Sequence, residues 1–360
     1  MQQLSGQDAM FLHAEIDGMP QHIGGVSIYD QSTAPDGKVR FKQILKMLER
    51  RLHLSPIFRR KLAFVPGGVG RPYWVEDGDF DLEYHVRHIA LPKPGDWRQL
   101  CILAARIHAV PLRRDKPMWE MYVIEGLNNV EGYPPGCFAL LLKVHHCAMD
   151  GATGTQFMNI VHDLTPETQD PGDAPAWIVE RPSKARMLGR AYLDAWRKPG
   201  RALGFIRDSI PAALRIRKQS KEGSIHFLED KPATRFQGKI SRHRVVGARK
   251  FDFEQVRAIK NSVPGATIND TMLTIVAGAM RRYLQDKGEM PKESLVTGCP
   301  IDVRSAEERA AGGNMVGFMN VSMRTEIDDP AEQLAAIHEE SKNAKSYAEA
   351  LGPRFAVDLT

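Results

Sequence analysis

The order of apolar and polar positions predicts a mixed α/β protein in the first half of the chain. Runs of strand length contrast with stretches whose apolar residues recur every three or four positions, which is helical spacing. We expect strands at 23–29, 119–124 and 138–144, and helices at 41–54, 98–110 and 152–164. This alternation is typical of helices packed on sheets.

The second half of the chain also has both helical and strand patterns, and it follows a linker segment. Helices are expected at 253–262 and 269–287, and strands at 249–253, 295–300 and 315–323. Residues 267–270 have the composition of a helix cap region. The pattern therefore predicts an N-terminal domain at 1–180, a linker at 181–237 and a C-terminal domain at 238–360.

Composition is that of a globular protein and excludes several classes. Hydrophobic residues make up 42% of the 360 positions and charged residues 26%, and this length favours two domains. No apolar run approaches the ~18 residues of a membrane span, and the first residues do not resemble a signal peptide. The four cysteines lack CxxC spacing, which indicates a reducing compartment such as the cytoplasm.

The linker concentrates the positive charge. Between Arg181 and Lys221 there are twelve Lys and Arg residues and only two acidic ones, Asp194 and Asp208. Apolar residues alternate with these cations, which is typical of a helix that lies on an anionic membrane or lipid particle. The alternative is a helical linker that packs its apolar stripe on the domains. Both interpretations stay open, and nothing in the pattern indicates nucleic-acid binding.

The candidate chemistry lies where the run at 138–144 ends. His145-His146-Cys147-Ala148-Met149-Asp150-Gly151 follows it directly, so the histidines leave the sheet where a ligand can reach them. One imidazole as a general base is the main interpretation, and a structural His146 is the alternative. We expect no metal, because adjacent histidines on a strand point apart and no second ligand cluster follows. Nothing marks Cys147 as a nucleophile.

Eight motifs spread along the chain carry a resemblance to a known family. His145 to Gly151 matches the HHxxxDG pattern of the chloramphenicol-acetyltransferase-like superfamily. Residues 4–15, 22–25, 117–120, 235–241, 269–270, 300–304 and 313–314 resemble further motifs of the bacterial wax ester synthase/diacylglycerol acyltransferase family. The resemblance implies two chloramphenicol-acetyltransferase-like α/β domains joined by the basic linker. Family members continue beyond residue 360, so we expect the second domain to be incomplete.

The resemblance also implies an activity and roles for the motif residues. The protein would transfer a long-chain acyl group from acyl-CoA, a co-substrate rather than a cofactor, to diacylglycerol or a long-chain alcohol. His146 would be the general base and His145 would support it. Asp150 would brace the loop through Arg304. Gly151 would pass close to substrate, although it could merely permit a turn.

Further site residues are expected on the same basis. Asn269 would help to shape the site from the second domain, with a helix cap as its plain alternative. Glu15, Gly25, Pro117 and Trp119 would line the substrate channel, with packing and turn roles as alternatives. The implied location is cytoplasmic, at the periphery of the inner membrane or of lipid inclusions.

Two rival functions share parts of this pattern. A condensation or polyketide-associated acyltransferase would use the same histidine but take its acyl group from a carrier protein. A non-catalytic protein bound to lipid droplets would use only the basic linker.

Overall fold

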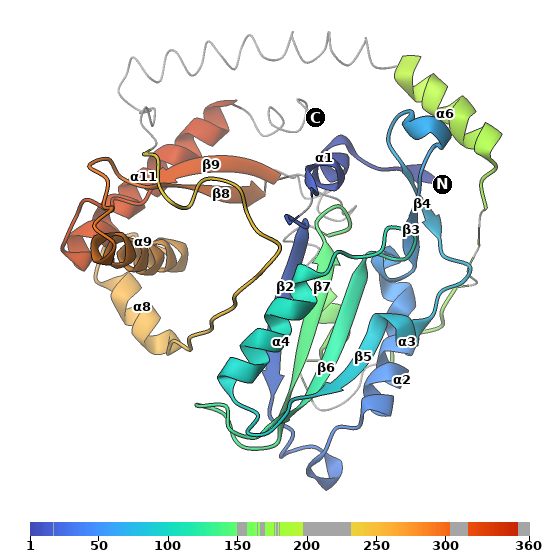
Figure 1. Cartoon of the computed structure of the whole chain (residues 1–360), viewed down its shortest axis with the longest axis horizontal. Helices are drawn as coiled ribbons and strands as arrows, with labels where there is room; N and C mark the ends of the chain where they lie inside the picture. Colours follow the sequence, from blue (N-terminus) through green and yellow to red (C-terminus); the bar gives the residue numbers. More distant parts are fainter. Residues whose placement is uncertain are drawn as a thin grey trace. The chain divides into compact units, whose positions relative to one another are not determined.

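The computed structural model describes residues 1–16, 18–149, 157–163, 165, 170–175, 177, 179, 181–196, 232–302 and 316–351. The chain divides into two compact units (Figure 1). The described part of the first unit comprises positions up to 196 together with 240–248, and the second comprises 232–239, 249–302 and 316–351. Both units combine helices and strands, so the expected mixed α/β class is confirmed.

A four-stranded sheet forms the centre of the first unit. Its strands are β2 (His22–Tyr29), β7 (Cys137–His145), β6 (Trp119–Leu127) and β5 (Val86–Ala90), in that spatial order. β7 runs antiparallel to both of its neighbours, whereas β5 and β6 are parallel. The register places His22 opposite His145 and Glu120 opposite Lys143. Side chains alternate between faces along a strand, so these four point to the same face.

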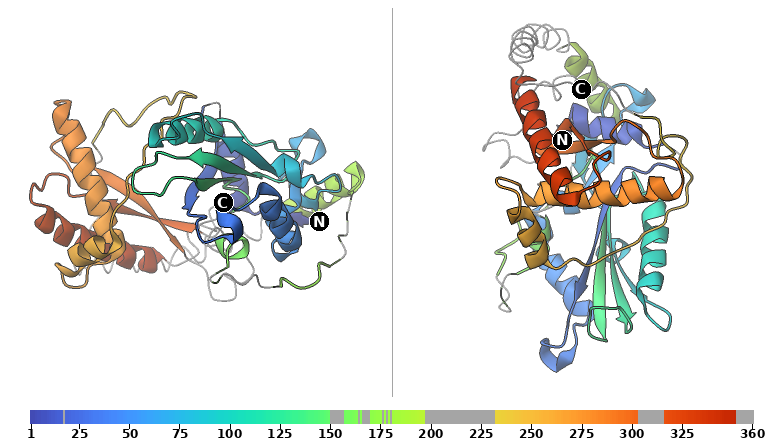
Figure 2. Two further views of the ribbon diagram at one scale, coloured as in Figure 1. Left: turned by 90° about the horizontal axis from the view of Figure 1, so that it is seen from below. Right: turned by 90° about the vertical axis from the view of Figure 1, so that its left-hand side faces the viewer.

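Two helices cover the opposite faces of this sheet (Figure 2). α2 (Phe41–Arg51) packs Ile44 and Leu48 against one face, and α4 (Trp97–Ala109) packs Leu100 and Ala104 against the other. The start of α4 is fixed by a capping box, in which the Asp96 side chain accepts from the backbone N–H of Gln99. The sheet is therefore buried on both sides, which explains its continuous apolar runs.

Smaller elements complete the first unit. β1 (Gln2–Gln3), β4 (Tyr73–Glu76) and β3 (Arg60–Ala63) form an antiparallel sheet. The helices are α1 (Gly6–Ala14), α3 (Leu82–His85) and α6 (Lys184–Trp196), with short 3-10 turns at Pro35–Gly37, Leu52–Leu54, Pro56–Phe58 and Pro66–Gly68. A further helical stretch is described at 157–161.

The second unit packs three helices with a two-stranded sheet. Its elements are α8 (Phe253–Asn261), α9 (Ile268–Asp286), β8 (Val296–Asp302), β9 (Val316–Ser322) and α11 (Pro330–Leu351). β8 and β9 are antiparallel. Ala277 and Leu284 of α9 share a buried cluster with Ile337 of α11, so the two long helices pack on each other.

Most elements expected from periodicity are present, with one error. The strand expected at 249–253 is wrong, because Asp252 instead caps α8 and its side chain accepts from the backbone N–H of Gln255. Such a carboxylate satisfies helix-end donors and ends the extended segment. The helix expected at 152–164 is described only at 157–161, where the chain is helical.

Candidate active site

The end of β7 is held by backbone hydrogen bonds on both sides. The N–H of His145 donates to the carbonyl of Met118 at 3.0 Å, and that of His146 donates to the carbonyl of Gln21 at 2.8 Å. A turn follows, in which the N–H of Ala148 donates to the His145 carbonyl at 2.9 Å. These bonds fix the two histidines where the chain leaves the sheet. Asp150, Gly151 and Arg304 lie outside the described residues, so the expected brace stays a prediction.

His145 is fully buried and both of its ring nitrogens are engaged. Its Nδ1 accepts from the backbone N–H of Cys147 at 3.0 Å, which leaves the proton on Nε2. Nε2 then donates to a carboxylate oxygen of Glu15 at 3.0 Å. Burial lowers the pKa of His145, and Glu15 offsets this only in part. A neutral ring with both nitrogens occupied supports the turn and is not placed to exchange protons with a substrate.

His146, by contrast, is only partly buried. Its ring stacks on that of Phe11, with 4.5 Å between centroids and 12° between planes. An imidazole that is accessible and held in one orientation can accept a proton from a ligand and return it. Of the two rings, a ligand can therefore reach only that of His146, and its role as a general base stays a prediction.

Cys147 is unsuited to act as a nucleophile. It is 2% exposed, and burial strongly raises the pKa of its thiol. Its Sγ lies 3.6 Å from Sδ of Met118 in an apolar cluster. Because the thiolate is the reactive form, this cysteine is inert at neutral pH.

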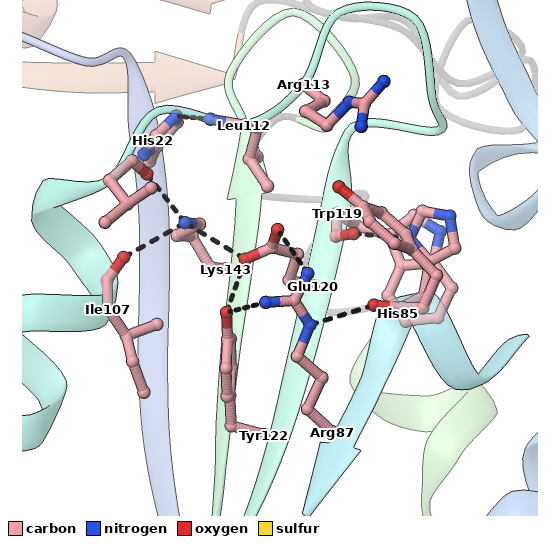
Figure 3. Close-up of polar contacts among 12 residues, drawn as sticks. His22, His85, Arg87, Ile107, Leu112, Arg113, Trp119, Glu120, Tyr122 and Lys143 are labelled. Carbon is pink, nitrogen blue, oxygen red and sulfur yellow. Dashed lines mark hydrogen bonds and ion pairs between the residues drawn. The ribbon is translucent and has the colours of Figure 1, made fainter.

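A buried charge pair lies beside the histidine turn, on the face of the sheet that α4 covers (Figure 3). Lys143 is 0% exposed, and its Nζ lies 3.2 Å from Oε2 of Glu120. The same Nζ donates to the carbonyls of Ile107 at 3.1 Å and Val110 at 2.8 Å. Lys143 thus joins β7 to the end of α4, where the free carbonyls of a helix attract positive charge.

Glu120 has further partners on its other side. The hydroxyl of Tyr122 donates to it at 2.8 Å, and the guanidinium of Arg87 lies 3.6 Å away. Burial, followed by the adjacent carboxylate, strongly raises the pKa of Tyr122. No motif of the sequence indicates this network. Its signal in the sequence is one charged residue inside each of two apolar strands, Glu120 and Lys143.

His22 is also buried on this face. Its Nε2 accepts from the backbone N–H of Leu112 at 3.2 Å. Burial and the nearby Lys143 lower the pKa of His22 to about 3. Burial also lowers the pKa values of His85 and His108. The first unit therefore contains several histidines whose side chains are neutral in the folded protein at neutral pH.

This neutrality predicts that the protein loses stability in acid. His22 has a pKa of about 3 in the folded state and about 6.5 when unfolded. Between these values the unfolded chain holds the proton and the native one does not, so the free energy of unfolding falls as pH drops through the window. The slope approaches about 1.4 kcal/mol per pH unit for this residue. Urea unfolding from pH 7 to 4.5 measures it.

His22→Gln is the matched variant for this test. Glutamine keeps an acceptor for the N–H of Leu112 but does not titrate in this range. The slope should become shallower in His22→Gln and stay unchanged in His13→Gln, since His13 is exposed. Equal slopes in wild type and His22→Gln would contradict the assignment.

The residues expected in the substrate channel lie in different surroundings. Glu15 was expected along the channel, but its carboxylate is engaged by His145 and by Arg114 at 3.2 Å. Trp119 is fully buried, and its indole N–H donates to the Phe58 carbonyl at 3.0 Å. Pro117 is buried beside it. These contacts are those of the packing alternative, and the role of the three residues in a channel stays a prediction.

The two glycines of β2 differ. A Cβ at Gly24 would come within 3.0 Å of the Leu142 carbonyl oxygen and 3.2 Å of the His108 ring. The strand needs glycine at position 24 to lie this close to β7 and α4. Gly25 is exposed, and a Cβ there would meet nothing within 4 Å. Its role in a channel stays a prediction.

Asn269 is exposed on the second residue of α9. The helix cap expected of it is instead Thr267, whose side chain accepts from the N–H of Asp270. Asp270 is buried and also accepts from Nδ1 of His338 at 3.0 Å. The cap alternative for Asn269 is therefore wrong, and its contribution to the site stays a prediction.

Two features are absent from the described residues. They include no group of three or more His, Cys, Asp or Glu side chains arranged to hold a metal ion. None of the helices in the described ranges combines the length and apolar character needed to cross a membrane.

Comparison with known proteins connects this geometry to one family. Residues 4–272 match the profile of the wax ester synthase/diacylglycerol acyltransferase catalytic domain, and 312–360 match the C-terminal domain of the same family. A protein of Mycobacterium tuberculosis H37Rv, provisionally named a diacylglycerol O-acyltransferase, is 35% identical over 96% of this chain and 73% of its own length. Another from that strain is 32% identical over 99% of this chain and 70% of its own length.

Solved structures share the fold. A wax ester synthase/diacylglycerol acyltransferase from Marinobacter aquaeolei VT8 superposes with a TM-score of 0.64 at 24% identity, covering 99% of this chain and 79% of its own. The first condensation domain of the CDA synthetase superposes with a TM-score of 0.58 at 16% identity, covering 96% of this chain and 76% of its own.

Proposed function

Because the chain belongs to the wax ester synthase/diacylglycerol acyltransferase family, we propose that it transfers a long-chain acyl group from acyl-CoA to an alcohol. The acceptor is diacylglycerol or a long-chain alcohol, and the product is a triacylglycerol or a wax ester. The observation that carries the proposal is the accessible ring of His146, fixed by Phe11 beside a fully engaged His145.

The proposed reaction needs a single proton acceptor, His146. His146 takes the proton of the acceptor hydroxyl as its oxygen attacks the carbonyl carbon of the thioester. The new C–O bond forms, the C–S bond breaks, and the imidazolium returns the proton to the departing CoA thiolate. A neutral imidazole suits both steps near neutral pH, and no metal or cofactor takes part.

A panel of acyl donors and acceptors tests this proposal. Palmitoyl-CoA is supplied with hexadecanol or with dioleoylglycerol, and both CoA thiol release and labelled ester are measured. The proposal expects ester formation with at least one acceptor. A palmitoyl group on a phosphopantetheinyl carrier protein is the competing donor. Transfer from the carrier alone would favour the condensation-type alternative, and no ester from any pair would overturn the proposal.

We also propose that the enzyme meets its insoluble substrates at an anionic lipid surface, and α6 supports this. One side of α6 packs on the first unit through Ala191, which lies in one buried cluster with Val65 and Tyr73, and Met187 of the same helix is also buried. The rest of the helix exposes large apolar side chains, from 41% at Leu188 to 73% at Trp196, which include Tyr192 and Leu193. Helix α6 thus supports both alternatives for the linker, packing on the domain and binding to a lipid surface. Residues 197–231 lie outside the described residues.

Basic residues accompany this exposed apolar surface. Lys184, Arg186 and Arg190 lie on the same helix, and its only acidic residue, Asp194, accepts from the Tyr73 hydroxyl at 3.2 Å. Apolar side chains beside cations suit the boundary between anionic headgroups and acyl chains, where tryptophan and tyrosine are favourable.

The triple variant Tyr192→Ser/Leu193→Ser/Trp196→Ser should therefore lose binding to vesicles of phosphatidylglycerol and phosphatidylcholine. The affinity for the vesicles should fall by more than about tenfold. Each apolar side chain that the lipid buries contributes on the order of 1 kcal/mol or more. Flotation at rising salt measures it. The matched control, Phe64→Ser/Val110→Ser/Val245→Ser, removes three exposed apolar residues elsewhere in the first unit. Equal loss in both triples would contradict a role specific to α6.

A further inference from the structure

The first helix of the chain is fixed firmly against the histidine turn. Ser5 caps α1, since its side chain accepts from the N–H of Asp8 at 3.0 Å. Leu4, Ala9 and Leu12 are buried in one apolar cluster with Met118 and Cys147, the residues that flank the end of β7. Because both ends of this contact are packed, α1 cannot shift without disturbing the turn.

Two side chains at the C-terminal end of this helix reach the two histidines. Phe11 lies in the last turn of α1, and Glu15 is the extended residue that directly follows the helix. The ring of Phe11 stacks on His146, and the carboxylate of Glu15 accepts from Nε2 of His145. Arg114 links the carboxylate back to the helix, donating to Glu15 at 3.2 Å and to the Leu12 carbonyl at 3.3 Å.

We infer that α1 is a clamp for the catalytic histidine, with Phe11 and Glu15 as positioning residues. This inference rests on the proposed function, in which His146 carries the proton. Glu15 fixes the tautomer of His145, whose Nδ1 then holds the N–H of Cys147 and closes the turn. Phe11 fixes the plane of His146 itself. Neither residue exchanges a proton in the proposed reaction.

Stacking has a chemical consequence beyond orientation. When His146 takes the hydroxyl proton it becomes an imidazolium parallel to a phenyl face. The π electrons of that face stabilise a cation placed within about 6 Å of the ring centroid, and the centroids here are 4.5 Å apart. An aliphatic side chain of similar size fills the same space without this stabilisation. Phe11→Leu therefore separates packing from the aromatic contribution.

The titration of His146 is the direct test. Protein labelled with [13Cε1]-histidine is titrated by NMR without substrate, and the His146 resonance is assigned by its loss in His146→Gln. Phe11→Leu should lower the titration midpoint by roughly half a pH unit, because the protonated ring loses its cation–π partner. Phe11→Tyr should restore it. The matched control is Phe64→Leu, an exposed phenylalanine in the same unit, which should leave the midpoint unchanged.

Kinetics provide the second measurement. Phe11→Leu should reduce kcat by about five- to tenfold and leave KM for palmitoyl-CoA within about twofold, since orientation and transition-state charge are affected more than binding. A midpoint and a kcat that match those of Phe64→Leu would overturn the clamp. If no variant and no wild-type protein transfers acyl groups, the proposed function fails, while the NMR titration still decides whether Phe11 acts on His146.

Discussion

Replacing His146 by glutamine should lower the rate of acyl transfer by about 10²- to 10⁴-fold, the usual contribution of a positioned general base. Glutamine retains the backbone N–H that donates to Gln21, so the strand end keeps its hydrogen bond. It also keeps a polar group of similar length, but it cannot accept a proton near neutral pH. Release of CoA thiol from palmitoyl-CoA in the presence of hexadecanol or dioleoylglycerol gives the rate.

The control separates chemistry from folding. His146 is partly exposed, so His146→Gln should unfold at nearly the same urea concentration as wild type. His145→Gln should be unstable as well as inactive, because the buried ring supports both Glu15 and Cys147. Transfer at the wild-type rate in His146→Gln would mean that another group accepts the proton.

Lys143→Met should be the most destabilising single change in the described part of the first unit, at about 3–5 kcal/mol. The substitution removes the cation 3.2 Å from Glu120 and leaves that carboxylate buried. It also removes the donor to the carbonyls of Ile107 and Val110 at the end of α4. Urea unfolding at neutral pH, monitored by far-UV circular dichroism, measures the loss.

A second substitution shows whether the unpaired charge is the cause. Lys143→Met/Glu120→Gln removes the charge and keeps an acceptor for the Tyr122 hydroxyl, so the double variant should recover about 1–2 kcal/mol. Lys46→Met, at an exposed position of α2, should lie within about 0.5 kcal/mol of wild type. If the double variant were no more stable than Lys143→Met, the cost would come from the carbonyls of α4 instead.

The long elements could be predicted because their periodicity is strong. The strands around 119–124 and 138–144 and the helices around 98–110 and 269–287 all occur, with ends shifted by a few residues at most. Shorter elements such as β3 and α3 were missed because four residues carry too little periodic signal. The strand expected at 249–253 is wrong because Asp252, which alternates with phenylalanines as in a strand, is the N-cap of α8.

Only part of the candidate site could be predicted from the sequence. The motif identified the two histidines, and the family resemblance singled out His146, whose ring is partly exposed whereas that of His145 is buried. Phe11 and Glu15 lie more than 120 residues away from them in the chain, so no local pattern reveals that they meet the histidines. Glu15 was therefore assigned to the channel. The spacing of Phe11 and Glu15 does not show that α1 ends between them, nor what the two side chains contact.

The distance between α1 and β7 along the chain also has a consequence during synthesis. Glu15 and His145 are separated by 130 residues, which a ribosome translates in roughly 7 to 26 seconds at about 5–20 residues per second. During that interval α1 can pack on Leu62 of β3 but not on the end of β7. A partner that occupied the apolar side of α1 in this interval would compete with the contacts that Phe11 and Glu15 make with the two histidines.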